Sequence, residues 1–137
     1  MITNTTKKKV ALFLREFLGA GTTKLGMGGG GTDANGIDLD VPLSTTADNS
    51  AISSDDKVLE IKSSFSGTSL QGYTVREVGF FADIATDTEM GDIETANFDM
   101  TGATEKENIM FARINFDAIG NFSTSDTIEV IYTMEVE

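Results

Sequence analysis

The chain has 137 residues and a formal net charge of −12, and it contains neither cysteine nor histidine. This composition excludes disulfide bonds, thiol nucleophiles, zinc sites built from Cys and His, and catalytic relays that use histidine. An acidic surface repels nucleic acid, and no apolar run approaches the roughly 20 residues of a membrane span. We therefore expect a single domain with neither a nucleic-acid nor a membrane partner.

Residues 6–18 predict an amphipathic helix at the start of the domain. Apolar residues recur there at the spacing of one helical face: Val10, Phe13, Leu14, Phe17 and Leu18. Gly19 follows at a position where helices commonly end. We expect this apolar face to pack against the rest of the domain.

A glycine-rich corner spans residues 26–36. Gly26, Gly28 and Gly31 satisfy the G-x-G-x-x-G pattern of nucleotide-binding loops. The segment that follows, TDANGIDLDVP, is not helical, and its carboxylates would repel a phosphate. We interpret the corner as a conformational element without a ligand or cofactor, mobile until a partner packs on it. A weak divalent-ion site between Asp33 and Asp40 stays open as an alternative.

Residues 58–136 are rich in strand patterns. Apolar and polar residues alternate in residues 58–65 and, most regularly, in residues 126–136. Residues 73–82 and 109–116 are apolar on both faces, which is typical of central strands. Together with the helix, these patterns predict an α+β domain in which the helix packs on a mainly antiparallel sheet or sandwich. The regular last strand is an edge that we expect to pair with another chain.

The two apolar strands predict one structural ion pair. If they are antiparallel neighbours with Phe81 opposite Ile109, the same register places Glu77 opposite Arg113. Each charge would be costly in a central strand without a partner. We therefore expect Glu77 and Arg113 to form a cross-strand pair.

An acidic insertion, residues 83–108, separates these two strands. It carries eight acidic residues against one basic residue, Lys106, which is too much charge to bury. We interpret it as a partner-facing loop outside the core, with a disordered loop as the alternative. The candidate interaction residues are Asp87, Glu89, Asp92, Glu94 and Asp99.

Six segments, taken in order, resemble the virion proteins of tailed bacteriophages, in particular the tail-collar fibre type. They are KVALFLREFLGAG, KLGMGGGGT, VLEIKSSFSG, YTVREVGFFAD, IMFARINFDAIG and DTIEVIYTMEVE. Each motif is weak by itself, but their order and spacing cover nearly the whole chain. The long acidic insertion departs from the family pattern, in which the two central strands are often tightly connected.

The resemblance implies a non-enzymatic structural protein of the tail, the baseplate or the fibre attachment. Such a protein assembles in the host cytoplasm and resides in the virion. It contacts copies of itself, with a trimer favoured, and other virion proteins. The resemblance supplies no catalytic, cofactor-binding or metal-binding residue. Alternatives are a capsid decoration protein, a module that binds a host-surface glycan, and a small carboxylate hydrolase. The chain has no tryptophan on which a sugar could stack.

Overall fold

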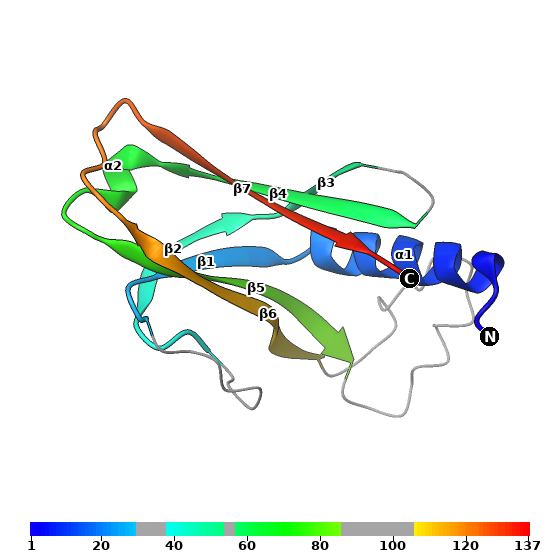
Figure 1. The fold of residues 1–137 in the computed structure, drawn as a ribbon. Helices are drawn as coiled ribbons and strands as arrows, with labels where there is room; N and C mark the ends of the chain where they lie inside the picture. The colour runs from blue at the N-terminus through cyan, green and yellow to red at the C-terminus, as the bar shows by residue number, and fades with distance from the viewer. Residues whose placement is uncertain (30–37, 54–56, 86–105) are drawn as a thin grey trace.

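The computed structural model describes residues 1–29, 38–53, 57–85 and 106–137 (Figure 1). The chain begins with helix α1 (Asn4–Gly19), whose first turn is capped by Thr3, because the Thr6 N–H donates to the Thr3 hydroxyl at 3.3 Å. The other elements of the described ranges are β1 (Thr22–Gly26), β2 (Pro42–Asp48), β3 (Ser50–Ser53), β4 (Val58–Ser66), α2 (Gly67–Leu70), β5 (Val75–Ala85), β6 (Lys106–Ile119) and β7 (Thr127–Glu135).

The strands form two antiparallel sheets that face each other as the two layers of a sandwich (Figure 1). Within the described ranges, one sheet has four strands in the order β2-β1-β5-β6, and the other has three in the order β3-β4-β7. The chain passes from β2 to β3 through Asn49 alone, so these two edge strands lie on the same side of the sandwich. The edges β6 and β7 therefore lie together on the opposite side. The predicted α+β class with antiparallel sheets is confirmed.

Helix α1 lies between the two layers at one end of the sandwich (Figure 1). Phe17 and Leu18 pack there in a buried cluster with residues of both sheets: Leu59, Ile61 and Ala82. A second buried cluster fills the rest of the interior: Leu25, Leu43, Phe65, Leu70, Val75, Val78 and Phe80. Val10 begins the predicted apolar face but is 38% exposed, so only the later turns of the helix enter the core. No helix of the described part is long and apolar enough to cross a membrane.

The strand boundaries correct two expectations. Strands begin at Thr22 rather than near residue 58, since the Ser- and Thr-rich segments β1, β2 and β3 also pair. The acidic insertion is also shorter than residues 83–108, because β5 continues to Ala85 and β6 begins at Lys106. Asp83 is opposite Asn108, which donates to its carboxylate at 2.9 Å. The five predicted interaction residues lie outside the described residues.

Candidate functional site

Glu77 is a fully buried carboxylate in the middle of β5, with 0% exposure. Its neighbours Val78 and Phe80 belong to the core, and side chains alternate along a strand. Glu77 and Gly79 therefore occupy the outer face of the four-stranded sheet. Residues 38–41, which lead into β2, cover this face, and Leu39 is buried there with 4% exposure. The site consists of Glu77 and the segments that close over it.

Three backbone N–H groups surround the Glu77 carboxylate. Gly28 donates to Oε2 at 2.5 Å, and Val41 donates to the same oxygen at 3.1 Å. Asp40 donates to Oε1 at 2.8 Å. A buried carboxyl group needs hydrogen-bond donors, and its oxygens satisfy the three N–H groups in return. The glycine corner thus donates to a side chain of the same chain.

Gly26 and Gly28 allow this close approach. A Cβ atom at position 26 would lie 2.7 Å from Cγ of Glu77, and one at position 28 would lie 2.5 Å from Cβ of Asp40 and overlap Oε2 of Glu77. The expectation of a corner that only a partner would fix is wrong for Gly28, which is buried and held by Glu77. The rest of the corner, residues 30–36, lies outside the described residues.

The predicted Glu77–Arg113 ion pair is wrong. Glu77 is opposite Asn115, and Arg113 is opposite Gly79. The register differs from the assumed one because Phe81 faces Met110, and a bulge next to it shifts the strands once more. Both charges are nevertheless buried, as expected, since the Arg113 side chain is only 7% exposed.

Arg113 and Lys24 attach the segment before β2 to the sheet. The Arg113 guanidinium donates to the Asp38 carbonyl at 3.2 Å and lies 3.4 Å from an Asp40 carboxylate oxygen. Lys24 of β1 pairs with the Asp38 carboxylate at 3.1 Å and stands 4.6 Å over the Phe81 ring. Both carboxylates of this segment that were candidates for a divalent ion therefore have basic partners.

Asn49 performs a similar task where the chain changes sheets, and sequence reasoning missed it. Its side chain donates to the Leu18 carbonyl at 2.9 Å, and it accepts from the Thr23 hydroxyl at 2.6 Å. Its backbone N–H donates to Gly21 O at 3.0 Å. The available signal was a single asparagine between two strand-forming segments, which is typical of turns in general.

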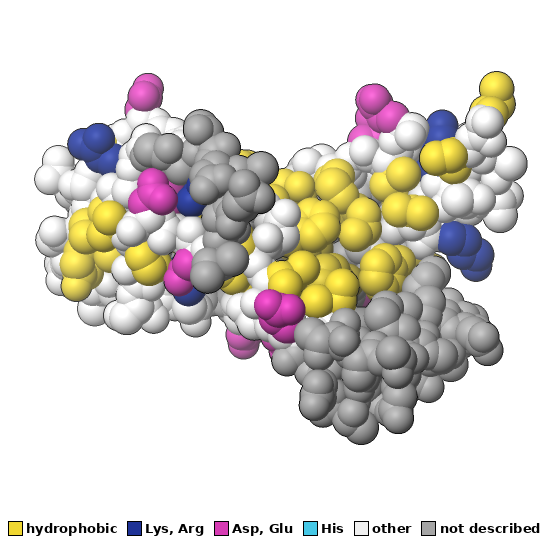
Figure 2. Space-filling view, turned by 90° about the horizontal axis from the view of Figure 1, so that it is seen from below, with side chains coloured by type: hydrophobic (Ala, Val, Ile, Leu, Met, Phe, Trp, Pro, Cys, Tyr) yellow, Lys and Arg dark blue, Asp and Glu magenta, His cyan; other side chains and the backbone are white. Residues whose placement is uncertain are grey.

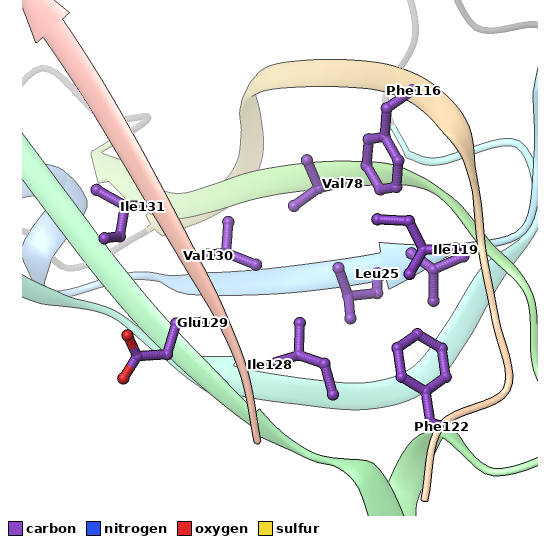
Figure 3. A pocket seen from close by; sticks show the side chains of 10 residues that line it. Leu25, Val78, Phe116, Ile119, Phe122, Ile128, Glu129, Val130 and Ile131 are labelled. Atoms are coloured by element: carbon purple, nitrogen blue, oxygen red, sulfur yellow. The ribbon is translucent and has the colours of Figure 1, made fainter. Parts of the chain in front are cut away.

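The side of the sandwich between β6 and β7 contains an apolar cavity of 270 Å³ (Figure 3). Ile128 and Val130 of β7 point into it, whereas Glu129 and Ile131 point away (Figure 3). The lining residues are Leu25, Val75, Val78, Phe116, Ile119, Phe122, Ile128, Glu129, Val130 and Ile131. The expectation of a central strand at residues 109–116 is wrong, because β6 is an edge. Ile114, opposite the core residue Val78, is 46% exposed as a result.

The opposite side of the sandwich contains a polar cavity of 470 Å³. It is lined by Thr46, Ala47, Asp48, Ser50, Lys62, Ser63 and Ser64. The Ser63 hydroxyl is buried there and has no hydrogen-bond partner among the described residues. None of the lining residues is aromatic, so this cavity offers no surface on which a sugar ring could stack.

Seen from below, hydrophobic, acidic and basic side chains are interspersed on the surface (Figure 2). A large group of hydrophobic side chains extends from the middle of this face toward the end that holds α1, and a smaller group lies at the opposite end (Figure 2). The exposed large hydrophobic residues of the described part include Met1, Ile2 and Val10. Acidic side chains stand apart from one another on this face (Figure 2). Comparison of the chain with models of protein families and with curated proteins finds no match.

Proposed function

We propose that the protein is a non-enzymatic structural component of a tailed-phage virion, in the tail, the baseplate or the fibre attachment. The proposal rests on a contact between two of the segments that resemble such proteins. Segment YTVREVGFFAD supplies Glu77, and segment KLGMGGGGT supplies the Gly28 N–H that Glu77 accepts. The glycine-rich motif and the strand motif that contains Glu77 therefore contact each other and stabilise the fold.

The proposed activity is contact between subunits. The sheet edges and the apolar cavity beside β7 are surfaces of the kind that protein partners cover. The resemblance favours a homo-oligomer of three subunits, in contact with other virion proteins. A glycan-binding module is less well supported, since the polar cavity lacks an aromatic platform.

The test is the composition of purified virions from the phage that encodes this chain. We expect mass spectrometry to detect the chain in several copies per particle, and a labelled subunit to appear at the tail, baseplate or fibre attachment. A label spread over the head would favour the capsid-decoration alternative. Absence of the chain from purified particles would overturn the virion role.

Binding of the isolated protein to whole host cells tests the glycan-binding alternative separately. The structural role predicts no saturable binding of the fluorescently labelled chain to cells. Saturable binding that a free host glycan competes away would favour the receptor-binding alternative instead.

A further inference from the structure

The described part of the two sheets has four edge strands, and three of them carry features that hinder pairing with another chain. The edge β2 begins with Pro42, and its register with β1 is interrupted. The edge β3 has four residues and an irregular register with β4. The edge β6 has two register shifts along its pairing with β5. Short length, proline and bulges are the usual protection of exposed edges.

The fourth edge, β7, has none of these features. Its nine residues pair with β4 in nine consecutive positions without a shift. Its sequence, TIEVIYTME, contains no proline, glycine or lysine. Ile131 stands at the centre of its outer face and is 54% exposed. The apolar cavity lies directly beside the strand, along Ile128–Ile131.

We propose that β7 pairs antiparallel with β7 of a second copy of this chain, about a two-fold axis at Ile131. In this register Ile131 is opposite its own counterpart. Thr127 of each copy is opposite Glu135 of the other, and Glu129 is opposite Thr133. The exposed isoleucines thus meet, and every glutamate faces a hydroxyl side chain.

The charges of β7 select this register over its neighbours. A two-fold centred on Tyr132 would place Glu129 opposite Glu135, and one centred on Glu129 would place that residue opposite itself. Directly opposed like charges destabilise a strand pair. Glu129 is also partly neutralised within its own chain by Lys62, at 3.0 Å. This complementarity of the strand with itself identifies a second copy as the partner.

Pairing of this kind would join two three-stranded sheets into one of six strands. It would also place the second β7 at the mouth of the apolar cavity, because neighbouring strands lie about 4.8 Å apart. The inference rests on the proposed function only in that subunits contact one another. It requires an even number of subunits, whereas the resemblance alone favours three.

Cysteine cross-linking tests the register, since the chain has no cysteine of its own. Under mild oxidation we expect I131C to form a covalent dimer rapidly, because residues directly opposite each other lie within disulfide reach. The T127C variant should not, since its counterpart would lie eight residues along the strand, about 26 Å away. The T127C/E135C double variant should cross-link again. Equal cross-linking of I131C and T127C, or none of I131C, would overturn the register.

Charge variants test the contact without a covalent bond. T127E places a glutamate opposite Glu135 of the other copy, and within its own chain Thr127 is opposite Ser66. We expect T127E to sediment as a monomer whose melting temperature matches that of the wild type at concentrations where the wild type has dissociated, and T127K to dimerise at least as strongly as the wild type. S44E, on the exposed face of β2, is the control that adds the same charge elsewhere.

The outcomes separate this inference from the proposed function. A wild-type trimer, or a T127E variant that associates like the wild type, would overturn the β7 pairing and leave the virion role intact. A monomer at every concentration tested would also overturn the pairing. Detection of the chain in purified virions answers the question of the virion role independently of these results.

Discussion

Backbone N–H groups are used in opposite ways around Glu77 and along β7. Gly28, Asp40 and Val41 lie where the chain departs from regular pairing, and one carboxylate of the same chain accepts all three N–H groups. β7 is fully regular and, within the described part of the chain, has a strand partner on one side only. The comparison indicates that the irregular backbone is held by hydrogen bonds to a side chain of the same chain, whereas the regular edge strand β7 is available to pair with a partner. Changes around Glu77 should therefore affect folding, and changes on β7 should affect association.

The largest expected effect comes from Glu77→Gln. The amide NH2 group of the new glutamine would face a backbone N–H group that now donates to the carboxylate. That backbone N–H would then be buried without an acceptor. We expect a loss of about 2–4 kcal/mol in the free energy of unfolding. For a chain of this size, each kcal/mol lost from the free energy of unfolding lowers the melting temperature by roughly 3–5 °C.

Glu107→Gln on β6 is the matched control for this prediction, because that glutamate is exposed. It should change the free energy of unfolding by less than about 0.5 kcal/mol. Equal melting temperatures for the two variants, measured by differential scanning calorimetry, would show that the buried carboxylate does not anchor the fold.

Two adjacent glycines give the next prediction. Gly28→Ala would overlap the Glu77 carboxylate and approach Asp40, so we expect a loss of about 2–3 kcal/mol. Among the described residues, the new methyl group of Gly29→Ala meets nothing closer than the flexible Arg76 side chain, at 3.9 Å, and the variant should be nearly neutral. Urea unfolding of both variants checks the difference. Similar midpoints would mean that the corner is not packed around Glu77 as described.

Asn49→Ala tests a second internal polar contact. It removes the acceptor of the Thr23 hydroxyl and the donor to Leu18 O, both buried. We expect a loss of about 1–3 kcal/mol with no change in association, because Asn49 lies on the side away from β7. Asn108→Ala, an exposed amide on β6, is the control. If Asn49→Ala changed the association state and left the free energy of unfolding constant, the assignment of folding contacts to the Asn49 side and of association to the β7 side would be contradicted.

The smallest effect is expected from Lys24→Met. This variant removes the ion pair with Asp38 and the cation over the buried Phe81 ring, but the Lys24 and Asp38 side chains are both partly exposed. We expect at most about 1 kcal/mol, decreasing as salt is added. Thermal unfolding at low and high ionic strength measures it. A loss that does not depend on salt would assign the effect to packing of the lysine stem instead.

Periodicity was sufficient to predict the helix and the four later strands. Alternating apolar residues such as Ile128 and Val130 lie on the same face of a strand, and that face is buried whichever strand is the neighbour. The Ser- and Thr-rich strands β2 and β3 were missed because their pairing depends on neighbours in the fold rather than on their own apolar residues. The edge position of β6 was missed for a similar reason, since apolar residues on both faces also occur beside an open cavity.

The Glu77 site could be predicted only in part. Burial of Glu77 and Arg113 follows from the apolar residues around them, but their partners depend on register. The pairing of Phe81 with Met110 and the bulge beside it together move Arg113 out of line with Glu77. The true acceptors and donors belong to residues 28 and 38–41, which no local pattern connects to β5. The two glycines of G-M-G were the only sequence signal of a close approach, and they do not identify what approaches.

The most direct test of the account is the solution mass of the unmodified chain, measured by light scattering across micromolar concentrations at physiological salt. Self-pairing of β7 predicts an even multiple of 14.6 kDa that falls toward 14.6 kDa on dilution. A constant mass of 14.6 kDa, or a trimer, would contradict the assignment of β7 as the contact between two copies.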